Sequence, residues 1–269
     1  MTSVLKNDGE SKMYIIKVKT DREMGSEGFV TRFLHDWYYH ENELMRPEMY
    51  GMGEPIRYKI EERGIEAAIK AWLKNKMPVM LKRKSSPKFE VDMSWRPQRG
   101  LDPRLFPWDC IIWLNYKAGN KLAIEMFKFI ITNLEPAFGY LTNEEDYKEK
   151  HYVEYKDRTG TTQKYIGREP GGKCLPHDVS ATLPGIYWVT YFGTWAISEI
   201  GKSKFKNLNV HCIEDYQTGY LVTLYKDSSI IGTQEAKDIE RDVINKLGRE
   251  KFFDKSLVNL DELFKDQFK

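Results

Sequence analysis

The chain has 269 residues, of which 41% are hydrophobic and 30% charged, a balance unlike that of a disordered or membrane-embedded protein. Its 42 Lys and Arg residues nearly cancel its 40 Asp and Glu residues, so the formal net charge is only +2. That charge disfavours a nucleic-acid binder that works through its overall field.

Residues 1–12 are polar and lack the apolar stretch of roughly 7 to 15 residues that a secretory signal needs. Nowhere does an apolar run approach the roughly 18 residues of a membrane-spanning helix. We therefore expect a cytoplasmic protein without a membrane partner. The odd number of cysteines disfavours a disulfide framework, and we expect reduced thiols at Cys110, Cys174 and Cys212.

The first half of the chain predicts strands accompanied by two amphipathic helices. Apolar side chains recur at spacings of three and four in residues 61–75 and again in residues 119–134. Residues 28–45 are rich in aromatics, and their periodicity does not decide between a helix and an extended chain. Strands are expected at residues 13–19, 79–82, 88–95 and 108–116.

A mixed aromatic and acidic stretch begins at residue 37. Most Tyr and Trp side chains lie in a core, but these residues also provide rigid amphipathic anchors at protein interfaces. The neighbouring glutamates suit a protein partner that presents basic groups. The predicted partner-binding residues are Trp37, Tyr38, Tyr39, Glu41, Glu43 and Tyr50. The densest basic cluster, at residues 82–84, is interpreted as a solvated hairpin loop.

The second half predicts a similar mixture of elements. Residues 143–150 are too charged for a central position, and residues 152–155 and 161–166 predict a hairpin that we interpret as an insertion or a domain junction. We then expect a strand from Ile186, a short helix at residues 196–200, strands at 209–215 and 219–225, and a helix at 234–247.

The order of these elements predicts an α+β fold, with a mainly antiparallel sheet covered by amphipathic helices. It disfavours a Rossmann arrangement. We expect one domain over residues 1–269, and a subdivision into residues 1–142 and 143–269, as two pseudo-equivalent halves, is the alternative.

Two local patterns resemble cofactor sites and fall short of them. Residues 167–174 have the glycines and the lysine of a phosphate loop, but Cys174 stands where a hydroxyl is needed. Cys174 and His177 have half the spacing of a zinc site. His211 and Cys212 do not complete that site, because neighbours on a strand point to opposite faces. We predict no cofactor, no metal and no catalytic residue.

Glu154 and Lys156 stand on a predicted strand, with Asp146 upstream, in the alternation that metal-dependent nucleases use. The sequence fixes no second acidic partner, and a charged hairpin explains the pattern without chemistry. Signatures of serine hydrolases and cysteine proteases are missing from the sequence. A metal-dependent nucleic-acid-processing or phage-defence enzyme is therefore kept as an alternative function.

Residues 183–195 form a β-branched and aromatic run in which Pro184 can precede a strand and Gly193 can end it. The run Leu-Pro-Gly-Ile-Tyr-Trp-Val-Thr-Tyr-Phe-Gly, followed by Ile200-Gly201 and Lys204-Phe205, resembles a stretch of bacterial polymorphic-toxin immunity proteins. The resemblance is closest to the immunity protein 52 family and its uncharacterised relatives, and its strong part covers about 25 residues. The residues that carry it are Pro184, Gly185, Trp188, Phe192 and Gly193.

This resemblance implies a non-enzymatic cytoplasmic protein that binds and neutralises a cognate bacterial toxin. It also implies that Trp188 and Gly193 belong to the structural core more than to the toxin-contact surface. The expected partner is thus a protein, a toxin domain, and nucleic acid is disfavoured. A phage-encoded inhibitor of a host defence protein would also act by binding a protein surface, and it is a second alternative. The oligomeric state is left open.

Overall fold

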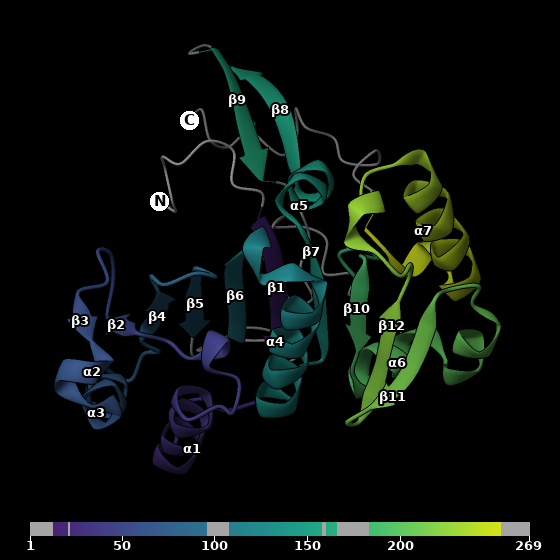
Figure 1. Cartoon of the computed structure of the whole chain (residues 1–269). Helices are drawn as coiled ribbons and strands as arrows, with labels where there is room; N and C mark the ends of the chain where they lie inside the picture. The colour runs from purple at the N-terminus through teal and green to yellow at the C-terminus, as the bar shows by residue number, and fades with distance from the viewer. Residues whose placement is uncertain (1–12, 21, 96–107, 158–159, 166–182, 254–269) are drawn as a thin grey trace.

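The computed structural model describes residues 13–20, 22–95, 108–157, 160–165 and 183–253. Ten strands form one sheet, in which all neighbouring strands are antiparallel. These strands are β1 (Met13–Thr20), β2 (Met49–Gly51), β3 (Tyr58–Lys59), β4 (Met80–Arg83), β5 (Phe89–Trp95), β6 (Trp108–Asn115), β7 (Phe138–Asn143), β10 (Val189–Phe192), β11 (Cys212–Tyr216) and β12 (Gly219–Thr223). Their order across the sheet is β11-β12-β10-β7-β1-β6-β5-β4-β2-β3 (Figure 1).

Helices accompany this sheet, and a separate hairpin projects beyond it at the top of Figure 1. The hairpin consists of β8 (Tyr152–Asp157) and β9 (Gly160–Tyr165). The α-helices are α1 (Glu27–Tyr38), α2 (Ile60–Arg63), α3 (Ile65–Asn75), α4 (Gly119–Leu134), α5 (Glu144–His151), α6 (Thr194–Ile200) and α7 (Gln234–Leu247). Short 3-10 helices are η1 (Glu43–Met45), η2 (Tyr116–Ala118), η3 (Lys202–Asn207), η4 (Ser228–Ile230) and η5 (Arg249–Lys251). The α+β prediction is confirmed.

The middle of the sheet is closed by the pairing of β1 with β7. Both Ile15 and Ile16 are buried, although neighbours on a strand point to opposite faces, so both faces of β1 are covered. On β7, a Cβ atom at Gly139 would lie 2.7 Å from a methyl group of Val18 and 3.2 Å from the ring of Phe127. The glycine therefore allows α4 to pack closely over these two strands.

One face of the sheet carries α1, α3 and α4. Phe33 of α1 lies between the other two helices, with its ring 6.2 Å from Trp72 of α3 and 6.2 Å from Phe129 of α4. Figure 1 shows α1 between these helices at the bottom of the view. A core of aromatic side chains thus holds the three helices together.

The opposite face of the C-terminal half packs against α6 and η3. Phe192 pairs with Phe138 in the β10–β7 register, on the face opposite to that of Tyr191 and Gly139. Its ring contacts Phe138 at 5.5 Å and Phe205 of η3 at 5.0 Å. Described helices therefore lie on both sides of the sheet in this half.

Several sequence-based boundaries need correction. The helix expected at residues 119–134 is confirmed. The single helix expected at residues 61–75 is divided into α2 and α3, because Gly64 interrupts it with a φ of +76°. The undecided residues 28–45 form α1 and η1. The strand expected from Ile186 begins at Val189. The basic cluster at residues 82–84 is not a solvated loop, because Lys82 and Arg83 belong to β4 and pair with Glu90 at 2.8 Å and Glu48 at 3.4 Å.

In the described parts of the chain, every helix is too short or too polar to cross a membrane.

Candidate functional site

The aromatic and acidic stretch that begins at residue 37 divides between core and surface. Trp37 and Tyr50 are buried, and Tyr38 is half-buried. The exposed members of the predicted partner-binding set are Tyr39, Glu41 and Glu43. The buried members therefore support this surface from below, and the exposed members lie on it.

Trp37 fixes the position of η1. Its indole N–H donates a hydrogen bond of 2.8 Å to the carbonyl of Met45, and its ring lies 5.2 Å from Phe129 of α4. Asn42 caps η1 by accepting a bond of 3.1 Å from the backbone N–H of Leu44. The segment after α1 is thus held by its own cap and by a buried side chain.

Two further contacts join this segment to α2 and α3. The imidazole of His35 lies 2.8 Å from the carboxylate of Glu66, and the ring of Tyr39 lies 5.6 Å from that of His35. The backbone N–H of Ile60 donates a bond of 2.9 Å to the carbonyl of Glu48. As a result, the end of α1, η1, α2 and the start of α3 border one surface.

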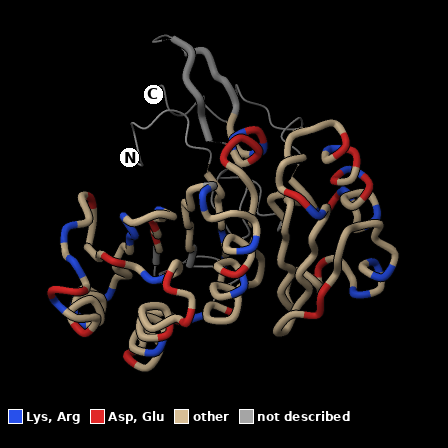
Figure 2. Tube along the Cα trace, viewed as in Figure 1, with Lys and Arg blue, Asp and Glu red and all other residues tan. Residues whose placement is uncertain are grey.

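We call this surface the acidic face. Its exposed acidic and large apolar residues are Asp36, Tyr39, Glu41, Glu43, Leu44, Tyr58, Glu61, Glu62 and Glu66, and the exposed basic residues of the same segment are Arg57, Lys59 and Arg63. Residues 35–66 contain eight Asp and Glu against four Lys and Arg, a formal net charge of −4 in a chain whose total is +2. Figure 2 shows the red positions of α2 at the lower left.

Only part of this acidic charge is compensated locally. Glu62 lies 2.6 Å from Lys59 and raises the pKa of that lysine, and Glu43 lies 3.1 Å from Arg46. Among the residues that the structure describes, none forms an ion pair with Asp36, Glu41 or Glu61. The acidic face can therefore attract a cation-bearing partner.

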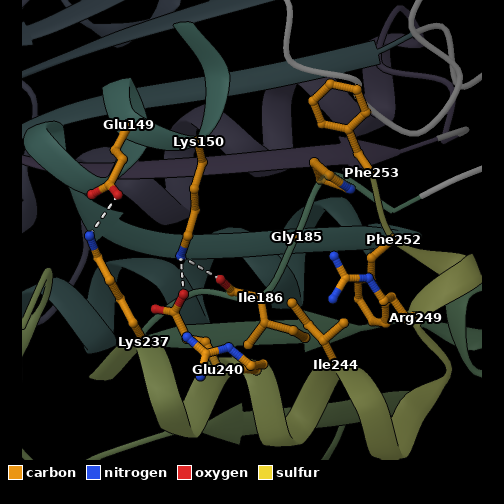
Figure 3. Close-up of a pocket in the computed structure, with 12 residues that line it drawn as sticks. Glu149, Lys150, Gly185, Ile186, Lys237, Glu240, Ile244, Arg249, Phe252 and Phe253 are labelled. Carbon is orange, nitrogen blue, oxygen red and sulfur yellow. Dashed lines mark hydrogen bonds and ion pairs between the residues drawn. The ribbon is translucent and has the colours of Figure 1, made fainter. Parts of the chain in front are cut away.

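A second feature is a pocket of about 270 Å³ enclosed by α5, residues 184–186, α7 and η5 (Figure 3). Apolar side chains, among them Ile186, Ile244 and Phe252, line most of it. Its charged lining residues are Glu149, Lys150, Lys237, Glu240, Arg241 and Arg249. The backbone N–H of Leu183 donates a bond of 2.8 Å to the carbonyl of Lys251, and the carbonyl of Leu183 accepts one of 2.8 Å from the N–H of Phe253, so the two sides are held together.

Two carboxylates share one ammonium group at this pocket. Nζ of Lys150 lies 2.9 Å from Asp146 and 2.8 Å from Glu240, and it donates a bond of 2.7 Å to the carbonyl of Ile186. Burial raises the pKa of Glu240 to about 7, against the opposing effect of Lys150, and Asp146 raises it further. Burial disfavours the charged form of Lys150, but the two carboxylates keep its pKa above its usual value.

A buried aromatic network lies next to this triad. The hydroxyls of Tyr187 and Tyr140 lie 2.7 Å and 3.2 Å from Nε2 of His151, and the two tyrosine rings stack at 3.8 Å. These polar groups form hydrogen bonds with one another inside the protein, as in a structural hydrogen-bond network. Sequence reasoning missed it, because nothing local marks His151 as a partner of Tyr187.

The motif residues at positions 184–193, which carry the resemblance noted in the sequence, lie in or next to the core of the C-terminal half. Trp188 is buried and donates a bond of 2.9 Å to the carbonyl of Tyr225, and Phe192 is buried against Phe138. Pro184 and Gly185 line the pocket described above, and Gly185 has a φ of +150°. A Cβ atom at Gly193 would collide with the carbonyl oxygen of Pro136. These residues therefore pack in the core or, at Gly193, allow two backbone segments to approach each other closely.

The other sequence candidates give no site in the described part of the chain. Residues 167–174 and His177 lie outside it, as do the side chains of Glu154 and Lys156, although the backbone of β8 is described. Cys212 is exposed on β11, beside His211. Among the described residues, no three His, Cys, Asp or Glu side chains are placed to hold one metal ion.

Comparison with solved structures finds a similar fold in the Pseudomonas aeruginosa T6SS protein PA0821. The TM-score is 0.57 and the sequence identity 10%, over 90% of this chain and 77% of that one. Comparison with family models and with curated protein sequences finds no match. At this identity, the similarity shows a shared fold.

Proposed function

We propose that this chain is a non-enzymatic, cytoplasmic immunity-type protein, which binds a cognate bacterial toxin and neutralises it by covering its surface. The motif at residues 183–193 resembles immunity proteins, and the fold is shared with a T6SS protein. Neither likeness carries the proposal alone, because motif residues lie in the core and a fold can host many functions.

The observation that carries the proposal is the distribution of exposed apolar side chains. In the described residues, the exposed large hydrophobic side chains all lie between residues 39 and 77 of the sequence: Tyr39, Leu44, Met52, Tyr58 and Met77. Three of them, Tyr39, Leu44 and Tyr58, belong to the acidic face, and exposed apolar groups rimmed by polar residues are typical of protein interaction sites. A binding surface near α1, η1 and β3 accounts for these three residues.

The first test is protection of growing cells. We expect co-expression of this chain to restore the growth of cells that express a toxic protein encoded beside its gene. As a matched comparison, Leu44→Arg should abolish protection and leave the melting temperature unchanged, because Leu44 is 44% exposed. If growth stays arrested with every neighbouring toxin, the immunity role is wrong.

The second test separates binding from catalysis. A protein that neutralises by covering a surface acts stoichiometrically, so residual toxin activity should fall linearly and reach zero near one chain per toxin. An enzyme that modifies the toxin would inactivate many toxin molecules per chain. Titration of purified toxin activity with this chain therefore distinguishes the two mechanisms.

A further inference from the structure

We propose that the acidic face is the docking surface for the partner protein, and that the partner presents basic side chains around an apolar depression that receives Tyr39 and Leu44. This inference rests on the proposed function only in assuming that the chain acts by binding a protein. It names the surface and the chemistry of the partner.

The first support is the segregation of charge. Residues 35–66 have a formal net charge of −4, whereas the whole chain has +2. Asp36, Glu41 and Glu61 are exposed and have no ion-pair partner in the described structure. Such a concentration of like charge does not help folding, but it speeds the encounter with a partner of opposite charge and disfavours others. It also repels the phosphates of nucleic acids.

The second support is the position of the apolar anchors. Tyr39 is 62% exposed and Leu44 is 44% exposed. Leu44 directly follows the exposed Glu43, and Tyr39 stands two residues before the exposed Glu41. Interfaces combine a few aromatic or aliphatic anchors with a polar rim that excludes water. The acidic face has both parts.

The third support is rigidity. Tyr39 is held against His35 and Tyr38, with ring distances of 5.6 Å and 5.0 Å. Leu44 stands on η1, which the cap at Asn42 and the indole of Trp37 fix in place. Anchors that are ordered before binding lose less conformational entropy when the complex forms. The face is therefore suited to docking without rearrangement.

The decisive experiment compares two triple variants with equal total charge. The face variant is D36K/E41K/E61K, and the control variant is E145K/D215K/E250K, which reverses exposed carboxylates on other elements. Both variants raise the formal net charge from +2 to +8. None of the six carboxylates forms an ion pair with a described residue, so loss of folding is not expected.

The probe is the protein that the wild-type chain captures from its host, purified and measured by biolayer interferometry at about 50 mM and about 300 mM salt. We expect the face variant to bind at least about tenfold more weakly, mainly through slower association, and to lose most of the salt dependence. The control variant should stay within about twofold of the wild type at both salt concentrations. Circular dichroism confirms that each variant is folded.

A second variant tests the anchors without changing charge. Tyr39→Ala combined with Leu44→Ala should weaken binding by at least about tenfold through faster dissociation. Both side chains are exposed, so the melting temperature should stay close to the wild-type value. Persistent wild-type affinity in this double variant contradicts the assigned role of the anchors.

The proposal is overturned if the face and control variants bind equally well, or if no host protein binds the wild-type chain. It is also overturned if the captured species is nucleic acid or a second copy of this chain. A captured protein that needs the acidic face but does not arrest growth when expressed alone supports the face and contradicts the immunity role. The two proposals therefore fail in distinguishable ways.

Discussion

The Lys150 triad contains more negative than positive charge. Asp146 and Glu240 both approach one ammonium group, and Glu240 is only 8% exposed. A buried carboxylate without a full counter-charge keeps its proton to a higher pH, and the pKa of Glu240 accordingly rises to about 7. Near neutral pH, a proton supplies the charge that the triad lacks.

The first prediction concerns the pH dependence of stability. The pKa of Glu240 rises from 4.5 to about 7 on folding. Its contribution to the free energy of unfolding is therefore fully present below pH 4.5 and is lost as the pH rises through about 7. The loss is on the order of 3 kcal/mol.

Glu240→Gln removes this titration and keeps a polar side chain beside Lys150. As the pH rises from about 5 to about 8, the free energy of unfolding of the variant should therefore increase relative to that of the wild type. Urea denaturation across this range measures the difference. Glu235→Gln, an exposed glutamate on the same helix, is the control and should run parallel to the wild type. A parallel profile for Glu240→Gln would show that Glu240 does not keep its proton.

The second prediction concerns Gly193, where the backbone of α6 approaches that of residues 136 and 137. Because a Cβ atom would collide with the carbonyl oxygen of Pro136, Gly193→Ala should destabilise the protein by about 1–3 kcal/mol or more. Gly28→Ala is a matched control inside α1 with nothing within 4 Å of the added carbon. It should stabilise by up to about 1 kcal/mol. Thermal unfolding should show a lower melting temperature for Gly193→Ala and a melting temperature at or above the wild-type value for Gly28→Ala.

At the scale of elements, α1 positions the acidic face through a residue that does not lie on it. Trp37→Phe removes the hydrogen bond to Met45 and leaves a buried carbonyl without its donor, which costs about 1–3 kcal/mol. The third prediction is that this variant also exchanges the backbone amide hydrogens of residues 43–46 faster. Trp72→Phe, the same change at a buried position of α3, should leave those amides protected. Equal exchange in both variants would contradict the role of Trp37.

The amphipathic helices were predictable because one apolar stripe faces one neighbour. In α4, Leu122, Met126 and Ile130 recur every four residues and are buried. In α1, Phe33 contacts both α3 and α4, and Trp37 adds a contact to β5 through Phe89. The apolar arc of α1 is therefore wide, and its sequence loses the clear period that identifies a helix.

The candidate site was predictable only as a region. Residues 37 and 39 are separated by about 200° around a helix axis, so burial of Trp37 places Tyr39 near the opposite side. Which of them faces solvent depends on where α3 and α4 pack, and the sequence does not state this. Likewise, Lys150 and Glu240 meet across the fold although they are far apart along the chain, and no local pattern joins them.

At the scale of the whole molecule, two consecutive parts of the chain meet at the centre of one sheet. Residues 13–115 supply the strands from β3 to β1, and residues 138–223 supply those from β7 to β11. The junction is the antiparallel register from Tyr14↔Asn143 to Lys19↔Phe138. Division of the chain at residue 142 falls inside β7, and the single-domain organisation stays a prediction that this junction makes testable.

The last prediction is that both halves unfold together. Separation of β1 from β7 would create two open sheet edges, and edges of this kind with apolar side chains such as Ile15 and Leu141 favour aggregation. Two variants each keep a single tryptophan, Trp72 or Trp188, which reports on one half of the sheet. Urea unfolding followed by far-ultraviolet circular dichroism and by the fluorescence of that tryptophan should give one midpoint. Fragments 1–134 and 135–269 should each fail to unfold cooperatively. Two separate midpoints, or a fragment with a cooperative transition of its own, would instead identify two independently stable halves that share a sheet.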